Sequence, residues 1–261
     1  MSAGRSLAVA QTVPVRGDVA ANLEQHLRLT RIAREAGAGL LLFPELSLTG
    51  YELDLAERLA FSPDDERLAP LVEAAASSSM ILIAGAPARV DGRLHIAAFI
   101  MSPDRSVDLY TKQRMGAFSS SASVDGIVPP AEAEFFHPGD HNPLIRFGGT
   151  TAAVAVCADT GRPTHPQAAA ARGATVYLAS MFVIPSDFER ETANLRRYAV
   201  EHSMLVGFAN YGGPSGGLAA AGRSAIWSPR GELIAELEPA GRGVAVALEE
   251  PAGWRGRAIR V

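Results

Sequence analysis

The sequence has little of three things that would assign it to a common class. It has one cysteine, Cys157, so no intrachain disulfide can form. It has no apolar run near the roughly 18 residues of a transmembrane helix, so no membrane span is predicted. It has no excess of basic charge, because the net charge is −4 and the pI is about 5.9, which argues against a nucleic-acid or anionic membrane partner. The first residues also lack a signal-peptide pattern, so we expect a cytoplasmic protein.

Lysine is almost absent as well. Lys112 is the single lysine among 24 basic residues, and all the others are arginine. Arginine stays protonated and spreads its charge, whereas lysine is a compact charge whose pKa responds to its surroundings. Coding bias would produce the same count, so the neighbours of Lys112 have to decide whether this ammonium group has a role.

What is present is ordinary globular composition: 261 residues, 48% hydrophobic and 20% charged. This excludes a disordered or fibrous chain. Apolar strand-like runs alternate with amphipathic helical stretches, in two halves that each read β-α-β-α-β followed by a hairpin. We therefore expect one α/β domain over residues 1–261, with sheets covered by helices. Strands are expected over 7–12, 39–43, 80–86, 94–101, 107–110, 151–156, 175–180, 204–210, 224–227, 233–237 and 244–248, and helices over 18–36, 63–78, 164–172 and 186–203.

Residues 114–143 break this alternation. They are rich in serine and proline and show no period, which predicts a long irregular segment. A loop of this length inside a compact domain is usually functional or disordered.

Three polar residues stand where apolar strands end. Glu45 follows the run at 40–44, Lys112 follows 107–111, and Cys157 follows 152–156. In open α/β sheets, ligands bind beyond the carboxyl ends of the strands. A thiol that attacks, a carboxylate that takes its proton and an ammonium that stabilises a substrate oxygen form a complete nucleophilic set. Taken singly, each residue also fits a structural role: a buried small hydrophobe for the cysteine, a loop start for the glutamate and a solvated surface for the lysine.

The residues around these three resemble the signature segments of a known family. Phe-Pro-Glu-Leu-Ser-Leu-Thr-Gly-Tyr over 43–51, Tyr-Thr-Lys over 110–112 and Val-Cys-Ala-Asp-Thr-Gly-Arg-Pro over 156–163 are similar to those of the nitrilase superfamily of carbon–nitrogen hydrolases. Supporting segments over 132–139, 196–210 and 222–231 extend the resemblance along nearly the whole chain. The resemblance implies a four-layer α-β-β-α sandwich, no metal or organic cofactor, and a homodimer or higher homo-oligomer.

The resemblance also implies roles for particular residues. Cys157 would be the nucleophile and Glu45 the general base, while Lys112 and the backbone N–H of Ala158 would stabilise the oxyanion. An additional glutamate, which helps to position substrate and lysine, would be Glu132, with Glu134 as the rival.

Three further residues lie close in sequence to these segments or strands. Met181 and Phe182, just past the strand at 175–180, line either the substrate pocket or the core. We expect Tyr51 to support Glu45 rather than to touch substrate.

Two departures from the family pattern concern the substrate. Gly161 stands where many members have an arginine, and Arg162 replaces an aromatic residue. In relatives that act on carbamoyl amino acids, an arginine near this position binds the substrate carboxylate. Its absence makes such substrates less favoured, although Arg162 could turn inward.

We therefore expect an amidase-like hydrolase that cleaves the C–N bond of a small linear amide or N-carbamoyl compound. A Cys thioester would form, and ammonia or an amine would be released. Nitrile hydrolysis and acyl transfer at the same site stay open, and so does a non-catalytic scaffold that retains the fold. The six histidines lack zinc-site spacing, and the glycine-rich stretches match no nucleotide-binding fingerprint, so no metal is predicted.

Overall fold

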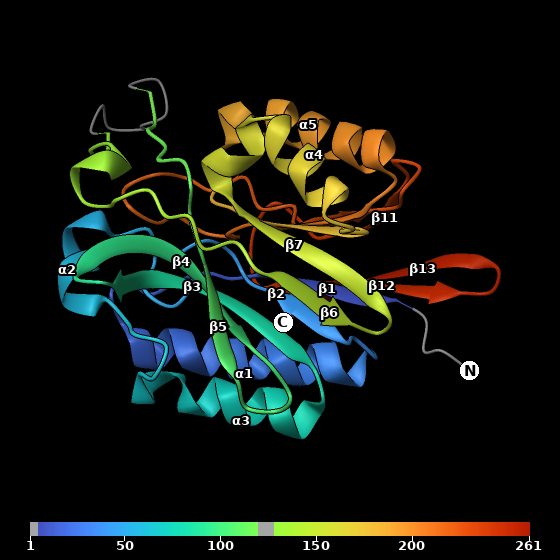
Figure 1. Cartoon of the computed structure of the whole chain (residues 1–261), viewed down its shortest axis with the longest axis horizontal. Coiled ribbons are helices and arrows are strands. Elements are labelled where there is room, and N and C mark those ends of the chain that lie inside the picture. Colours follow the sequence, from blue (N-terminus) through green and yellow to red (C-terminus); the bar gives the residue numbers. More distant parts are fainter. Residues whose placement is uncertain (1–4, 120–127) are drawn as a thin grey trace.

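The computed structural model describes residues 5–119 and 128–261, which form two mixed sheets packed face to face (Figure 1). The first sheet has seven strands, in the order β13 (Gly253–Arg260), β12 (Gly243–Glu250), β1 (Ser6–Gln11), β2 (Leu40–Leu42), β3 (Ile81–Val90), β4 (Arg93–Met101) and β5 (Val107–Thr111). The second has six, in the order β11 (Leu233–Glu236), β10 (Ala225–Trp227), β9 (Leu205–Ala209), β8 (Val176–Ser180), β7 (Thr150–Val156) and β6 (Leu144–Phe147).

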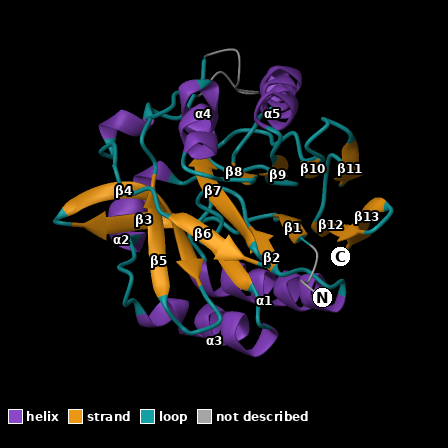
Figure 2. Ribbon diagram, turned by 45° about the vertical axis from the view of Figure 1, so that its right-hand side comes forward, coloured by secondary structure: helices purple, strands orange, loops and turns teal. Residues whose placement is uncertain are grey.

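Helices cover the outer face of each sheet, which completes the expected four-layer α-β-β-α sandwich (Figure 2). The first sheet carries α1 (Val19–Glu35) and α3 (Ala69–Ser78), and the second carries α4 (Thr164–Ala171) and α5 (Phe188–His202). The remaining helical segments are short: α2 (Ala56–Leu59) and the 3-10 turns η1 (Leu53–Leu55), η2 (Glu66–Leu68), η4 (Glu132–Glu134), η5 (Cys157–Gly161) and η6 (Pro185–Asp187). Within the described residues, no helix is long and apolar enough to cross a membrane.

The strands alternate residue size between the two faces of each sheet. In β1, Leu7 and Val9 point into the layer between the sheets, whereas Ala8 and Ala10 face α1 and α3. In β7, Val154 likewise lies between the sheets. Successive strand side chains point to opposite faces, so a wholly apolar run is buried on both sides. Small alanines let the helices approach, while each larger side chain between the sheets contributes about 1.5–3 kcal/mol by its burial.

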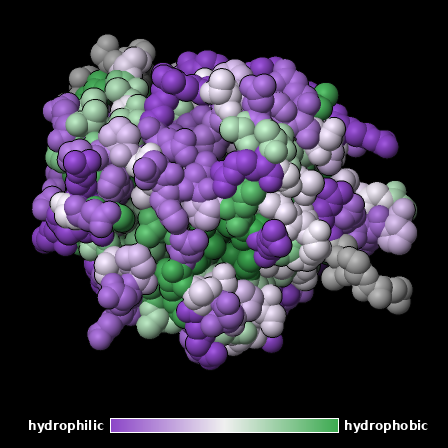
Figure 3. Space-filling model, viewed as in Figure 1, coloured by the Kyte–Doolittle hydropathy of each residue, from purple (hydrophilic) through white to green (hydrophobic). Residues whose placement is uncertain are grey.

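Figure 3 shows hydrophilic side chains over most of the face seen in Figure 1. A hydrophobic area near its centre lies over β5 and β6, which end the two sheets on the same side of the molecule.

Most expected elements are present, and the differences have local causes. The strand expected at 80–86 runs on to Val90 and turns into β4 at Asp91-Gly92, whose positive φ values of 49° and 75° suit a two-residue hairpin. The helix expected from residue 63 begins at Ala69, because Asp65 instead caps the short turn η2 through the N–H of Arg67.

Two strands were not anticipated. β6 follows directly on the irregular segment, and β13 is rich in glycine and arginine, which disguises it. β13 forms because it pairs with β12 along its whole length as the edge of the sheet. The described parts of 114–143 contain one 3-10 turn, η4, and residues 120–127 lie outside the described residues.

Candidate active site

The three polar residues that follow strands come together where the two sheets meet. Glu45 lies in the turn after β2, and Lys112 follows β5 directly, so both come from the first sheet. Cys157 follows β7 in the second sheet and begins η5. Lys112 and Glu45 are completely or almost completely buried. The packing of one sheet on the other therefore places a thiol beside a carboxylate and an ammonium.

Lys112 holds two carboxylates. Its Nζ lies 2.6 Å from Oε1 of Glu45 and 2.7 Å from the carboxylate of Glu132, and none of these side chains is more than 1% exposed. Two anions and one cation leave this buried cluster with a net negative charge before any substrate enters. A buried ammonium is stable here because both carboxylates compensate it.

Glu132, rather than Glu134, is the glutamate at the lysine. Its carboxylate accepts hydrogen bonds from Lys112, from the Tyr51 hydroxyl at 2.7 Å and from the Gly116 N–H at 2.6 Å. Glu134 is exposed, and its carboxylate accepts from the N–H of Ala131 at the start of η4. The expectation for Tyr51 was wrong in its partner: the hydroxyl donates to Glu132 instead of Glu45, and the ring also lines the pocket.

The turn that carries Glu45 is pressed against β3. A Cβ at Gly85 of β3 would lie 2.3 Å from the backbone N of Leu46 and 2.7 Å from the carbonyl O of Pro44, so only glycine fits there. Leu46 itself has a φ of 51°. The Tyr211 hydroxyl donates to the Glu45 carbonyl from the second sheet. Gly85 escaped the sequence analysis, because a glycine within a strand gives no sign of what approaches it.

The electrostatics of the cluster favour proton transfer. Burial raises the pKa of Glu45 to about 7, although Lys112 opposes the shift. Burial alone would lower the pKa of Lys112, but the two carboxylates hold it well above its usual value, so the ammonium stays charged. Burial, followed by the charge of Glu45, raises the pKa of the Cys157 thiol. A protonated thiol thus faces a carboxylate whose pKa is close to neutral pH.

The backbone at Cys157 is strained, with a φ of 43° in the left-handed region. Its Sγ lies 3.8 Å from the carbonyl O of Phe182. Asp159 holds the turn, because its Oδ2 accepts from the N–H of Val156 at 3.1 Å. The strain turns the thiol out of the strand direction and into a pocket.

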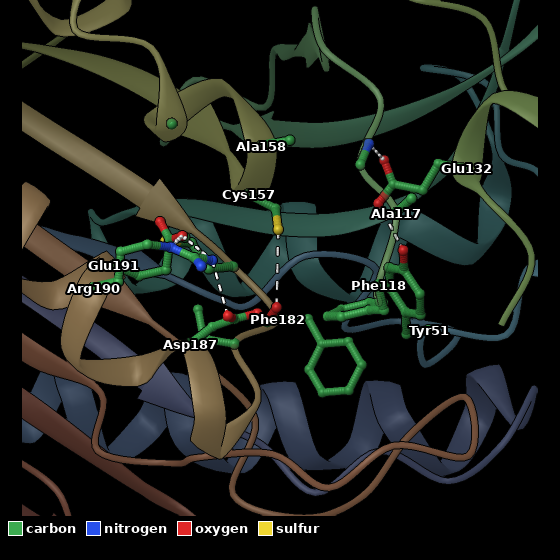
Figure 4. A pocket seen from close by; sticks show the side chains of 14 residues that line it. Tyr51, Ala117, Phe118, Glu132, Cys157, Ala158, Phe182, Asp187, Arg190 and Glu191 are labelled. Atoms are coloured by element: carbon green, nitrogen blue, oxygen red, sulfur yellow. Dashed lines mark hydrogen bonds and ion pairs between the residues drawn. The ribbon is translucent and has the colours of Figure 1, made fainter. Parts of the chain in front are cut away.

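That pocket encloses about 150 Å³ at Cys157 (Figure 4). Tyr51, Phe118 and Phe182 form one wall, with ring centroids 5.1–5.6 Å apart. Ala158 and Met181 also line it. Met181 and Phe182 each line this pocket and also pack in a core layer, Met181 beneath the outer helices and Phe182 between the sheets.

Charged residues that the sequence analysis missed stand on the opposite side of the pocket. Arg190 of α5 lies 2.9 Å from Asp187 and 3.0 Å from Glu191, and all three line the pocket (Figure 4). Their spacing along one helix face was a visible signal, but nothing in the pattern shows which face meets the thiol. Arg162 does not turn inward: it is exposed and lines a separate hollow. Across 5–119 and 128–261, no group of three His, Cys, Asp or Glu side chains could hold a metal ion.

Three known proteins show what this chain is similar to. An amidase of the nitrilase superfamily from Nesterenkonia, solved as a cysteine-to-alanine variant, superposes with a TM-score of 0.82 at 26% identity, over 97% of this chain and 93% of that one. The same amidase has been solved with butyramide, and with the acetamide moiety of fluoroacetamide attached to its active-site cysteine.

The other two are similar in sequence. The glutamine-dependent NAD(+) synthetase of Thermotoga maritima is 25% identical over 87% of this chain and 38% of its own length. A nitrilase from Pyrococcus abyssi is 24% identical over 87% of this chain and 82% of its own. The chain thus spans well under half the length of the synthetases that it matches.

The model of the carbon–nitrogen hydrolase family matches residues 6–255, which is almost the entire chain. This agrees with the four-layer sandwich and with the residues grouped around Lys112. The chain belongs to the carbon–nitrogen hydrolase family, within the nitrilase superfamily.

Proposed function

We propose that this chain is an amidase-like hydrolase that cleaves the C–N bond of a small linear amide or N-carbamoyl compound through a thioester on Cys157. The observation that supports it most directly is the cluster of Glu45, Lys112 and Cys157 at one pocket, with the lysine held by two carboxylates. An amide carbonyl is a poor electrophile, so its attack requires an activated nucleophile and a stabilised oxyanion together.

Each residue has a step in the proposed mechanism. Glu45 takes the proton of the Cys157 thiol, and the sulfur attacks the carbonyl carbon. The Lys112 ammonium and the Ala158 N–H stabilise the oxyanion, at about 3 kcal/mol for each preorganised donor. The C–N bond then breaks, and the leaving nitrogen takes the proton from Glu45. Water, deprotonated by Glu45, attacks the thioester to release the acid and restore the thiol.

The pKa directions suit these steps. Because the pKa of Cys157 is raised, the thiol keeps its proton until a base removes it. A base with a pKa of about 7 can both accept and return that proton at neutral pH. Glu132 has its carboxylate occupied by three donors, so we assign it to positioning Lys112.

The pocket supports a small acyl group. A drug-sized ligand needs at least about 300 Å³, and this pocket encloses about 150 Å³. The Nesterenkonia amidase, solved with butyramide, points to the same class of substrate.

A second candidate is the side-chain amide of glutamine. The charges of Asp187, Arg190 and Glu191 across the pocket from the aromatic wall could pair with the ammonium and carboxylate of an amino acid. The similarity to glutamine-dependent synthetases favours the same substrate.

The test is ammonia release from a panel of aliphatic amides, glutamine, carbamoyl amines, carbamoyl amino acids and nitriles. We expect the wild type to release ammonia from at least one amide, and Cys157→Ala to lose more than about a thousand-fold in kcat while its Tm is retained. Glutamine as the best substrate would favour the second candidate. No release from any substrate, with a thiol that iodoacetamide does not alkylate, would contradict both candidates and favour a scaffold.

A further inference from the structure

A second polar network lies behind the nucleophile turn, at a hollow separate from the pocket, and His165 in it is half-buried. His165, near the start of α4, has its Nδ1 2.9 Å from the hydroxyl of Tyr177 on β8. Its Nε2 lies 3.1 Å from the hydroxyl of Tyr110 on β5. The Tyr110 hydroxyl in turn donates to Oδ2 of Asp159 at 2.7 Å. The network therefore joins the second sheet and its covering helix to the first sheet.

The hydrogen-bond donors in this network can be assigned by starting from Asp159. Tyr110 gives its proton to Asp159, so its oxygen must accept from His165, and Nε2 carries the hydrogen. Nδ1 is then unprotonated and accepts from the Tyr177 hydroxyl. Burial lowers the pKa of His165, Asp159 opposes that shift and Arg172 reinforces it, so the imidazole is neutral at pH 7. The Nε2–H tautomer of His165 thus satisfies every group in this network.

Asp159 connects this network to the site. Its Oδ1 accepts from the N–H groups of Gln113 at 3.2 Å and Arg114 at 2.8 Å, which directly follow Lys112. Its Oδ2 accepts from the N–H of Val156, which directly precedes Cys157. A single buried carboxylate thus fixes the backbone next to the lysine and the backbone next to the thiol.

We propose that His165 is a positioning residue: as the neutral Nε2–H tautomer it orients the Tyr110 hydroxyl toward Asp159 and so sets Cys157 against Lys112. The inference rests on the proposed function, because it assumes that these two residues act together. His165 does not line the pocket at Cys157. Its effect is on geometry, where a misplacement of about 1 Å can cost about a hundred-fold in rate.

The experiment compares His165→Phe, which keeps a ring but removes both hydrogen bonds, with His165→Gln, whose amide can still donate to Tyr110. His141→Gln is the control, since His141 is largely exposed and bonds to Asp108 on the same strand as Tyr110. Amide hydrolysis is measured per native molecule, with the native fraction of each variant taken from its denaturation curve, so that unfolded molecules are not counted.

We expect His165→Phe to lower kcat about ten-fold with KM within two-fold of wild type. His165→Gln should recover most of that loss, and His141→Gln should match wild type. A purely structural role would lower the Tm and the native fraction but leave kcat per native molecule unchanged, which would overturn the proposal. A glutamine variant as impaired as the phenylalanine variant would also overturn it, because the donor to Tyr110 would then be irrelevant.

Two further measurements cover the remaining cases. If His165→Phe does not fold, Tyr177→Phe removes only the remote hydrogen bond, and an unchanged kcat in that variant overturns the proposal. The alkylation rate of Cys157 reads the same geometry without any hydrolysis, and His165→Phe should slow it several-fold. A wild type that is alkylated rapidly but hydrolyses no amide contradicts the proposed function alone, whereas equal alkylation of wild type and His165→Phe contradicts this inference alone.

Discussion

At the scale of single residues, Lys112 joins the charged groups of the site. Because Lys112 is held at 2.6 Å and 2.7 Å by two carboxylates, its ammonium has a fixed direction and a secure charge. The two carboxylates are not equivalent. Glu132 is fully hydrogen-bonded, whereas Oε2 of Glu45 is buried and has no hydrogen-bond partner among the described residues. The free oxygen is the one suited to receive a proton.

The two neighbouring glutamates provide a matched pair of variants. Glu132→Gln removes a charge that holds Lys112, and we expect kcat for amide hydrolysis to fall about a hundred-fold. Glu134→Gln should stay within two-fold of wild type, because Glu134 is exposed and bonds to Ala131. Steady-state kinetics on the best amide measures both. Equal losses in the two variants would contradict the position of Glu132 at the lysine.

In the proposed mechanism, the pKa of Glu45 sets the acid limb of the pH profile of kcat/KM. The base must be deprotonated, so kcat/KM should fall as pH drops through about 7, the value to which burial raises this pKa. Glu45→Gln should remove most activity at every pH. A pH series of kcat/KM checks this, and a limb near the ordinary glutamate pKa of about 4.3 would show that the pKa of the base is not raised.

At the scale of the elements, the close approach of β3 to the Glu45 turn fixes the base. Gly85→Ala would place a methyl group 2.3 Å from the Leu46 nitrogen, so the turn must move. We expect the free energy of unfolding to fall by about 1–3 kcal/mol and amide hydrolysis to fall at least about ten-fold. Gly161→Ala is the control for stability alone, because nothing lies within 4 Å of its Cβ position and its φ is not positive, although Gly161 lines the pocket. Urea denaturation compares the two variants, and kinetics follows Gly85→Ala; equal free energies of unfolding in the two variants would contradict the packing argument.

The elements also show what a sequence can predict. Glu45, Lys112 and Cys157 were predictable, because each directly follows an apolar strand within a recognisable segment. The choice between Glu132 and Glu134 was not, since both lie in an irregular stretch without period. Arg190 was missed because its role depends on which face of its helix meets the pocket, and Gly85 because its role depends on the turn that packs against it. β13 was missed because pairing with β12, rather than its own composition, makes it a strand.

At the scale of the whole molecule, stability is linked to pH through His26. This residue of α1 is fully buried, with its Nδ1 2.7 Å from the Asn22 carbonyl O and its Nε2 2.9 Å from Ser47 in the Glu45 turn. Burial lowers its pKa to about 4, from the ordinary histidine value of about 6.5. Between these values the unfolded chain binds the additional proton, so acid favours unfolding.

We therefore expect the contribution of His26 to the free energy of unfolding to be constant above pH 6.5 and to decline as pH falls toward about 4. The full loss is about 3 kcal/mol. Denaturant titrations of wild type and His26→Gln over this range measure it, with the exposed His137→Gln as the control. If acid lowers the free energy of unfolding of wild type and of His26→Gln by the same amount, the loss does not come from His26.

The division of the site between the two sheets has a consequence for the newly made chain. The first sheet carries Glu45 and Lys112, and the thiol belongs to the second. Until the sheets dock, Cys157 lies beside neither Glu45, the proposed base, nor Lys112, so an incompletely folded molecule lacks the proposed catalytic cluster. During refolding, hydrolytic activity should therefore return later than the helical signal. The return of hydrolytic activity would therefore report that the two sheets have docked.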